Sequence, residues 1–256
     1  MKSEKLKPKI RSQKSEPPLN LELLHLCDSL FPIGGFAYSD GLEAAAVRLT
    51  AFAEASALKN PDTTYASVEQ LRVWLEAVLD DTIGRVEGPA MWHAWRAVAE
   101  DDLAAVIQLD EELTALRPSS AARRSSRAMG QRLLTTWLTL HPDPRLEQLA
   151  AMAKIGTIGP VLPVAFAAAS VSAGVTRRES VGAYAYTRLA ATVSAAMRLM
   201  PIGQTEAHRL LARMLEHVPV VVDRLAASDA RPESFAPMMD VAAMTQQYLH
   251  SRLFRS

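Results

Sequence analysis

The sequence has one cysteine, Cys27, so no disulfide can form within the chain. It also has no charge excess, because 28 lysines and arginines balance 28 aspartates and glutamates. That balance argues against a nucleic-acid binder, which would carry a basic surface. No apolar secretory core follows the basic residues at the N-terminus. These absences predict a cytoplasmic protein with no membrane or nucleic-acid partner.

Charge is missing altogether from one stretch, Ile155 to Thr176, which is nominally long enough to cross a bilayer. Its composition argues against a membrane span, because alanine and serine dilute its hydrophobicity and helix-breaking residues interrupt it. The interruptions are Gly156, Gly159, Pro160, Pro163 and Gly174. We therefore expect a buried helix within this stretch.

What the chain does have is helical periodicity. Hydrophobic residues make up 49% of the sequence, and glycine and proline fall mostly at breaks between apolar stripes of helical spacing. The pattern predicts an all-α, single-domain globular bundle of about ten helices over residues 19–256. Residues 1–18 carry six basic and two acidic side chains with few large apolar residues, and we expect a disordered basic tail.

The segment Leu23 to Glu43 is predicted to form a helix, a shaped loop and a second helix. Phe31-Pro32 ends the first helix, and Gly34-Gly35 permits backbone angles that other residues avoid. Asp40 is placed to cap the second helix, with Glu43 completing a capping box. A phosphate-binding loop is excluded, because Phe36 stands where Lys-Ser or Lys-Thr is needed and no strand precedes the glycines.

Three later helices carry distinctive signals. Ser119 or Ser120 begins a helix in which Gly130 leaves room for another backbone to approach. Thr176 and Glu179 form a capping box that opens a long helix rich in small residues, our candidate for the central helix. Arg198 lies in its last turn, where a cation interacts favourably with the helix dipole.

No catalytic constellation is visible. The six histidines are scattered, and His25 and Cys27, two residues apart on a helix, point to different faces and do not chelate one metal. The sequence has no nucleophile elbow, no His-Glu-x-x-His and no dinucleotide loop. We therefore predict neither an active site nor a metal ligand set.

Four blocks of sequence resemble motifs of one known protein family, and they occur in the same order as in that family. They are the run LFPIGGFAYSDGLE that ends at Glu43, an Arg-x-x-Arg-x-Met-Gly run that ends at Gly130, RLMPIGQ from Arg198, and RLFRS at the C-terminus. They are similar to the motifs of the urease accessory protein UreF family, and the resemblance extends through them over most of the chain, roughly residues 23–256. The chain departs from that family at Ala37, where serine is usual, and at Gly159-Pro160, which lacks a usual histidine.

The resemblance implies a cytosolic, all-α, non-enzymatic urease maturation factor. Such proteins form homodimers, bind UreD (also called UreH), and recruit the GTPase UreG to apo-urease, so that GTP hydrolysis is coupled to nickel delivery. We expect Glu43 and Arg198 to be surface residues facing UreG or the nickel path, with Gly34, Gly35 and Asp40 shaping the loop beside them. The expected contact with UreD or UreH is Arg252, Leu253, Phe254 and Arg255. No cofactor is expected, and nickel is expected in transit only.

Two alternatives stay open at this stage. An all-α enzyme could bring Glu43, Arg198 and a histidine together in a small-molecule pocket for acid–base chemistry. Exposure of Glu43 on a flat surface would favour the maturation factor, and enclosure in a concave pocket would favour the enzyme. The apolar pair Leu253-Phe254 could dock either on this chain or on a partner.

Overall fold

The structure is a computed structural model, and it describes residues 20–55 and 63–255. Over these residues it is all-helical, with no strand, which confirms the predicted fold class. The predicted basic tail, residues 1–18, lies outside the described residues. The first helices are α1 (Leu21–Leu26), α2 (Leu42–Ala55), α3 (Thr63–Ala77), the π-helix η2 (Val78–Glu87), α4 (Gly88–Ala99) and α5 (Leu103–Ala115). They are followed by α6 (Ser120–Leu140), α7 (Pro144–Lys154), α8 (Leu162–Ser172), α9 (Arg177–Leu199), α10 (Gln204–Ser228) and α11 (Pro237–Thr245), with short 3₁₀ turns at Gly35–Ala37 and Gln246–Tyr248.

The uncharged stretch forms the buried helix α8, as predicted. Every residue from Leu162 to Val171 is buried, and α8 packs against α4, α6 and α9. The backbone of Pro160 and Val161 crosses Gly130 of α6 so closely that a Cβ at Gly130 would lie 1.9 Å from the Pro160 carbonyl oxygen. Buried Asp110 fixes the same turn by accepting the N–H groups of Gly159 and Val161, at 2.8 and 2.9 Å. Among the described residues, no helix is long and apolar enough to cross a membrane.

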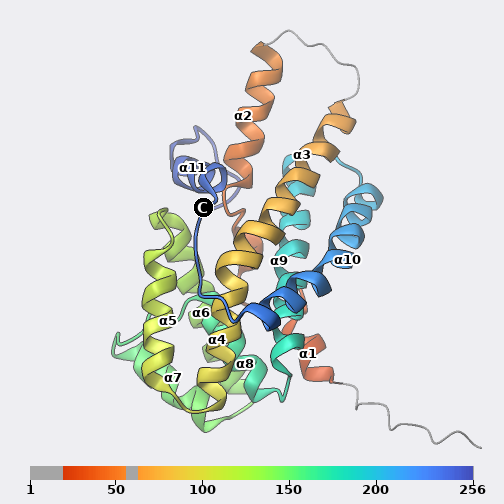
Figure 1. The fold of residues 1–256 in the computed structure, drawn as a ribbon. Helices are drawn as coiled ribbons and strands as arrows, with labels where there is room; N and C mark the ends of the chain where they lie inside the picture. The colour runs from red at the N-terminus through yellow and green to blue at the C-terminus, as the bar shows by residue number, and fades with distance from the viewer. Residues whose placement is uncertain (1–19, 56–62, 256) are drawn as a thin grey trace, which may run out of the picture.

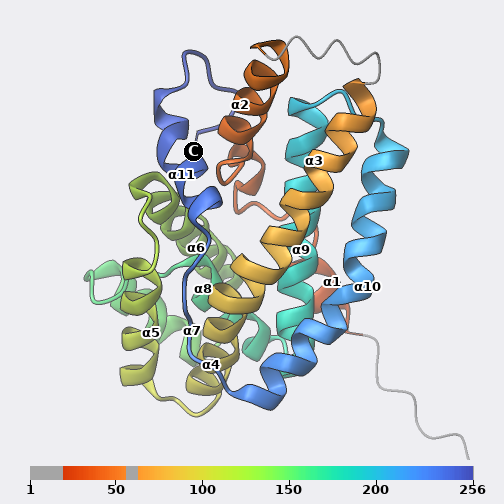
Figure 2. The same ribbon diagram turned by 45° about the horizontal axis from the view of Figure 1, so that its top comes forward.

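The long helix α9 also follows its prediction. Thr176 and Glu179 form a complete capping box at its start, and it ends at Leu199, just before Pro201. It lies against α3 and α10, and Figure 2 shows these three helices side by side. Among the residues whose burial the structure describes, however, α8 is buried over nearly its whole length, and α9 keeps one face partly open to solvent.

The predicted end of the first helix was wrong. Helix α1 ends at Leu26 rather than at Phe31-Pro32, because the side chain of Asp28 accepts the N–H of Leu30 and holds the chain in a turn. Gly84 lies within η2 and Gly88 begins α4, so the chain stays helical from α3 to α4 without a break at either glycine. Both glycines instead allow close packing, because a Cβ at either one would collide with side chains of α10.

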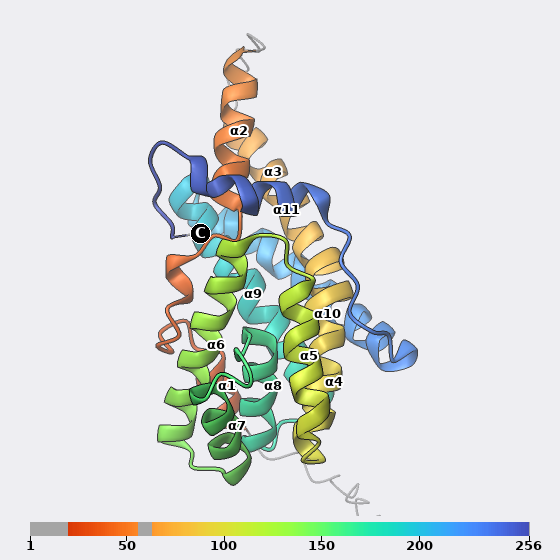
Figure 3. The ribbon, with the colours of Figure 1, turned by 90° about the vertical axis from the view of Figure 1, so that its left-hand side faces the viewer.

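Helix α11 and the residues after it lie across one end of the bundle. Figure 1 shows α11 and the C-terminus beside α2, and Figure 3 shows α11 crossing the end of α6. The loop between α1 and α2 packs against the same region. Segments from both ends of the chain therefore meet at one place.

A junction of four sequence motifs

The loop between α1 and α2 rests on α6. Gly34 adopts a φ of 78°, and a Cβ there would lie 2.4 Å from the guanidinium of Arg132. A Cβ at Gly35 would contact the sulfur of Met129 at 3.9 Å. Gly34 therefore shapes the loop, because its φ is positive and Arg132 of α6 lies against it. Gly35 has no positive φ, and a Cβ there would make only ordinary contacts, so the predicted role in shaping the loop is seen at Gly34 and not at Gly35.

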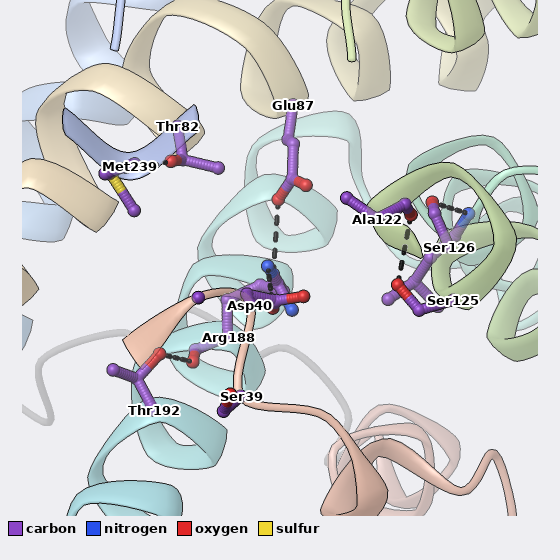
Figure 4. Close-up of polar contacts among 12 residues, drawn as sticks. Ser39, Asp40, Thr82, Glu87, Ala122, Ser125, Ser126, Arg188, Thr192 and Met239 are labelled. Carbon is purple, nitrogen blue, oxygen red and sulfur yellow. Dashed lines mark hydrogen bonds and ion pairs between the residues drawn. The ribbon is translucent and has the colours of Figure 1, made fainter. Parts of the chain in front are cut away.

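Asp40 is not a helix cap. Its φ is 50°, in the left-handed region, and its carboxylate forms an ion pair with Arg188 at 2.7 Å (Figure 4). An N-cap residue needs an extended backbone, so this conformation rules out the predicted capping box with Glu43. The strained backbone is maintained by the ion pair and by Gly41, which continues the turn with a φ of 93°.

The partner of Asp40 belongs to a buried charge cluster. Arg188 also contacts Glu87 at 3.2 Å, Glu87 contacts Arg117 at 2.5 Å, and the Tyr184 hydroxyl donates to Glu87 at 2.9 Å. Burial raises the pKa of Glu87 and Asp40, but the guanidiniums of Arg188 and Arg117 together outweigh that effect and hold both pKa values below their usual range. Burial, followed by the charge of Glu87, raises the pKa of Tyr184 well above its usual value. Asp40 and Glu87 are therefore both ionised at neutral pH.

Glu43 is buried, with only 4% of its surface exposed, so the prediction that it is a surface residue was wrong. Its carboxylate accepts the main-chain N–H of Leu253 at 2.5 Å and that of Phe254 at 3.2 Å. It also accepts the side-chain amide of Gln246 at 3.2 Å. The side chain thus turns inward because the C-terminal segment supplies three donors for a carboxylate that would otherwise be buried unpaired.

Gln246 completes this connection. It is fully buried, and its side-chain oxygen accepts the Gly41 N–H at 3.1 Å and the Ser39 hydroxyl at 3.2 Å. Sequence reasoning did not find Gln246, since a glutamine within the sequence Thr-Gln-Gln-Tyr has no local feature that marks it as buried. Its partners lie more than 200 residues away.

The C-terminal motif docks on this chain itself. Phe254 is 3% exposed, and the guanidinium of Arg198 stands over its ring at 4.3 Å. Arg198 also donates to the Phe36 carbonyl at 2.8 Å, and the Arg255 N–H donates to the Ala37 carbonyl at 2.9 Å. Arg198 is exposed, as predicted, and so are Arg252, Arg255 and Leu253, the last with 55% of its surface accessible.

All four motif blocks therefore meet in one place, which we call the junction: residues 31–43, residues 129–132, Arg198 and residues 246–255. The sequence predicted these segments separately. Their convergence is a finding of the structure.

A cavity of about 90 Å³ lies beside the junction, under α11. Its walls include Asp40, Glu87, Arg117 and Arg188 from the charge cluster and Asp240 from α11. Burial raises the pKa of Asp240, and the charge of Arg117 offsets only part of that rise. Glu43, Arg198 and the histidines do not line this cavity, so the pocket expected for an enzyme is not formed by those residues. Among the described residues, no group of three or more histidine, cysteine, aspartate or glutamate side chains is placed to hold a metal.

The comparisons with known proteins agree with the motif blocks. The family model for UreF matches residues 65–215, more than half of the chain. The chain is 32% identical to the urease accessory protein UreF of Methylibium petroleiphilum over 92% of its own length and 93% of that protein. This chain belongs to the UreF family. The UreF proteins of Polaromonas sp. and Paracidovorax citrulli are 29% and 30% identical to this chain, and each match covers 92% of this chain. The family model covers α6 and Arg198, while the loop before α2 and the C-terminal motif lie outside its matched range.

Proposed function

We propose that this chain is a urease maturation factor that acts as a non-enzymatic adaptor in the cytoplasm. In this role it binds UreD or UreH and the GTPase UreG, and it couples GTP hydrolysis to nickel delivery into apo-urease. Membership in the UreF family is the observation that carries the proposal. The adaptor role also fits the chemistry of the junction, which uses its polar groups to hold main chain together rather than to form a reactive pocket.

The surface beside the junction has features of a protein-binding face. Exposed Leu253 and Phe36 stand next to Arg198, Arg252 and Arg255, and apolar side chains with an arginine rim are typical of protein interfaces. We propose that Arg252, Leu253 and Arg255 contact UreD or UreH. Phe254 supports this contact from within, since it is buried against Arg198.

Helix α11 extends this face. Met238, Val241 and Met244 recur at helical spacing and are all exposed, and Tyr248 follows with 79% of its surface accessible. An exposed apolar stripe of this length on a monomer is a feature of interaction sites. We include it in the proposed contact with UreD or UreH.

For UreG and the nickel path, the candidate residues are Gly34, Gly35, Asp40, Glu43 and Arg198. In our proposal, Arg198 makes the contact directly and the others act by shaping the loop, because Glu43 is buried and Asp40 is held by Arg188. We further propose a homodimer, and nickel that passes through the assembly without a tight site in the isolated chain.

Reconstitution of urease activation tests this function. Apo-urease, UreD, UreG, GTP and nickel are combined with the chain, with no added protein, or with Arg198→Ala. We expect full activation with the chain, background activity without it, and a loss of roughly tenfold or more with Arg198→Ala, in line with the effect of removing one interface arginine. Arg178→Ala, at an exposed arginine elsewhere on α9, is the matched control and should activate normally. Equal activation with and without the chain would refute the proposal.

A further inference from the structure

A second cavity lies away from the junction, between α4, α5 and the segment that follows α10. Its volume is about 200 Å³, and it shares no lining residue with the cavity beside the junction. Helices α4 and α5 pack side by side and are joined at residues 100–102, as Figure 3 shows. We call the space between residues 93–100, residues 102–109 and Arg231 the α4–α5 cleft.

The α4–α5 cleft has an apolar base and a polar rim. Ala97 and Leu109 are buried, whereas Arg96, Gln108 and Arg231 are exposed. A concave site with a few polar groups around an apolar base is the usual form of a small-molecule binding site.

Several polar groups of the cleft already have partners. Asp102 caps α5 by accepting a main-chain N–H at 3.0 Å, and Arg231 pairs with Glu112 at 2.6 Å. The Nε2 atom of buried His93 lies 3.1 Å from the Ala230 carbonyl oxygen, and this nitrogen carries the proton because a carbonyl can only accept. These three side chains are therefore held in place by the protein itself.

Arg96 and Gln108 differ from them. In the part of the chain that the structure describes, neither side chain has a hydrogen bond or an ion pair, although both line the cleft. A guanidinium presents a planar set of N–H donors that matches the two oxygens of a carboxylate or a phosphate. The side-chain amide of Gln108 offers a second, uncharged donor. The cleft thus holds unused donors suited to an anion.

The electrostatic environment of Arg96 also favours an anion. The neighbouring guanidinium of Arg177 stands over the Trp92 ring at 3.8 Å, and its Nη2 atom is buried with no hydrogen bond, 3.5 Å from Asp229. Burial and then the charge of Arg96 lower the pKa of Arg177, and the opposing charges of Asp229 and Glu100 offset only part of that decrease. The two guanidiniums therefore repel each other, and an anion beside Arg96 would reduce this repulsion.

We propose that the α4–α5 cleft binds a small molecule through one oxyanion group, a carboxylate or a phosphate, with the Arg96 guanidinium as its main contact. The Gln108 amide donates a further hydrogen bond, and the apolar base contacts the rest of the ligand. Glu100 and Asp102 also line the cleft, and their charges favour a ligand with one anionic group over a ligand with two. The site is separate from the junction, so the proposal does not depend on which proteins the chain binds.

NMR titration of the full, isotope-labelled chain tests the site. Inorganic phosphate and propionate are added separately, and chloride keeps the ionic strength constant because salt screens charge interactions. We expect one saturable set of shifts that includes the main-chain amides of Ala97, Gln108 and Leu109, and no shift at Ala167 in buried α8. The probe that binds more tightly identifies the oxyanion. Absence of saturation with both probes, or shifts spread over the whole surface, would overturn the proposal.

Two substitutions should change the affinity in opposite directions. Arg96→Gln should weaken binding of the tighter probe by roughly tenfold or more, because it removes charge-assisted hydrogen bonds. Glu100→Gln should strengthen binding by roughly two- to fivefold, because it removes a like charge from the wall of the cleft.

Arg213→Gln, at an exposed arginine on α10, is the matched control and should leave the affinity unchanged. All three substituted positions are exposed, so the variants should fold, and circular dichroism checks that they do. Parental affinity in folded Arg96→Gln, or an equal loss in Arg213→Gln, would show that the cleft is not the binding site.

Discussion

The carboxylate of Glu43 accepts the main-chain N–H of Leu253 at 2.5 Å, across 210 residues of sequence. This contact joins the first motif of the chain to the last. Its acceptor is buried, and its donor belongs to a residue whose side chain faces solvent. Glu43 therefore helps to build the junction from within, whereas Leu253 presents its side chain outward.

Glu43→Ala should destabilise the protein. It leaves the Leu253 and Phe254 amides and the Gln246 side chain without their acceptor, and the expected loss in free energy of unfolding is roughly 1–3 kcal/mol. Denaturant unfolding followed by circular dichroism measures it. Glu111→Ala, on an exposed position of α5, is the control and should change stability by less than about 0.5 kcal/mol.

Alanine substitutions at two neighbouring residues should differ widely in their effect on the free energy of unfolding. Phe254→Ala removes a buried ring and should cost roughly 3 kcal/mol of stability. Leu253→Ala removes an exposed side chain and should cost less than about 0.5 kcal/mol. Thermal unfolding of the two variants checks this difference. If Leu253→Ala is as destabilising as Phe254→Ala, the docked arrangement of the C-terminus is wrong.

The glycines of the bundle offer another matched pair. Gly130→Ala should destabilise by roughly 1–3 kcal/mol, because the new methyl group collides with the backbone at Pro160. Gly182→Ala, in α9, meets nothing within 4 Å and should stabilise by about 0.5–1 kcal/mol through its effect on the helix. The free energies of unfolding of the two variants should therefore change in opposite directions.

The protein should become less stable in acid, because protonation of Asp40 removes a charge from the cluster. The pKa of Asp40 is lower in the folded chain than in the unfolded chain, so its contribution is fully present above the unfolded value near 4 and is lost as the pH falls through the folded pKa. Asp40→Asn should be less stable than the parent at pH 7, with a difference that shrinks below about pH 4. Urea unfolding between pH 7 and pH 3 measures it, and a difference that stays constant would exclude a role for the charge.

The helices could largely be predicted from sequence because helical periodicity and capping residues act locally. Thr176 and Glu179 bond each other three residues apart, so the capping box was visible before the structure. Gly130 was also recognised as a place for close backbone approach. The capping box depends only on residues within one helix turn, and the role of Gly130 depends only on its lack of a side chain, so both features could be predicted locally.

The junction could not be predicted, because its contacts join residues far apart in the chain. The spacing of Asp40 and Glu43 matches a capping box, but Arg188 and Gln246 draw their carboxylates into other contacts. Glu87 looks like an ordinary charged helix residue, and its burial follows only from its partners elsewhere in the chain, Tyr184 and Arg188 on α9 and Arg117 between α5 and α6. Short-range rules do not contain this information.

Nickel titration tests the proposed transit of the metal. Isothermal titration of the purified chain should show no site of sub-micromolar affinity with one nickel ion per subunit. The same titration after addition of UreD and UreG indicates whether the assembly binds what the single chain does not. A tight stoichiometric site in the isolated chain would contradict the proposal.

Co-purification with UreD tests whether the exposed C-terminal residue Leu253 contacts this partner. Tagged chain carrying Leu253→Asp is compared with the parent and with Ile155→Asp, which places the same charge on an exposed apolar residue, 79% accessible, that is not part of the junction. Both variants should fold normally. We expect the parent and Ile155→Asp to retain UreD, and we expect the amount of UreD retained by Leu253→Asp to fall by roughly tenfold or more. Retention of UreD by folded Leu253→Asp at the level of the parent would contradict this expectation.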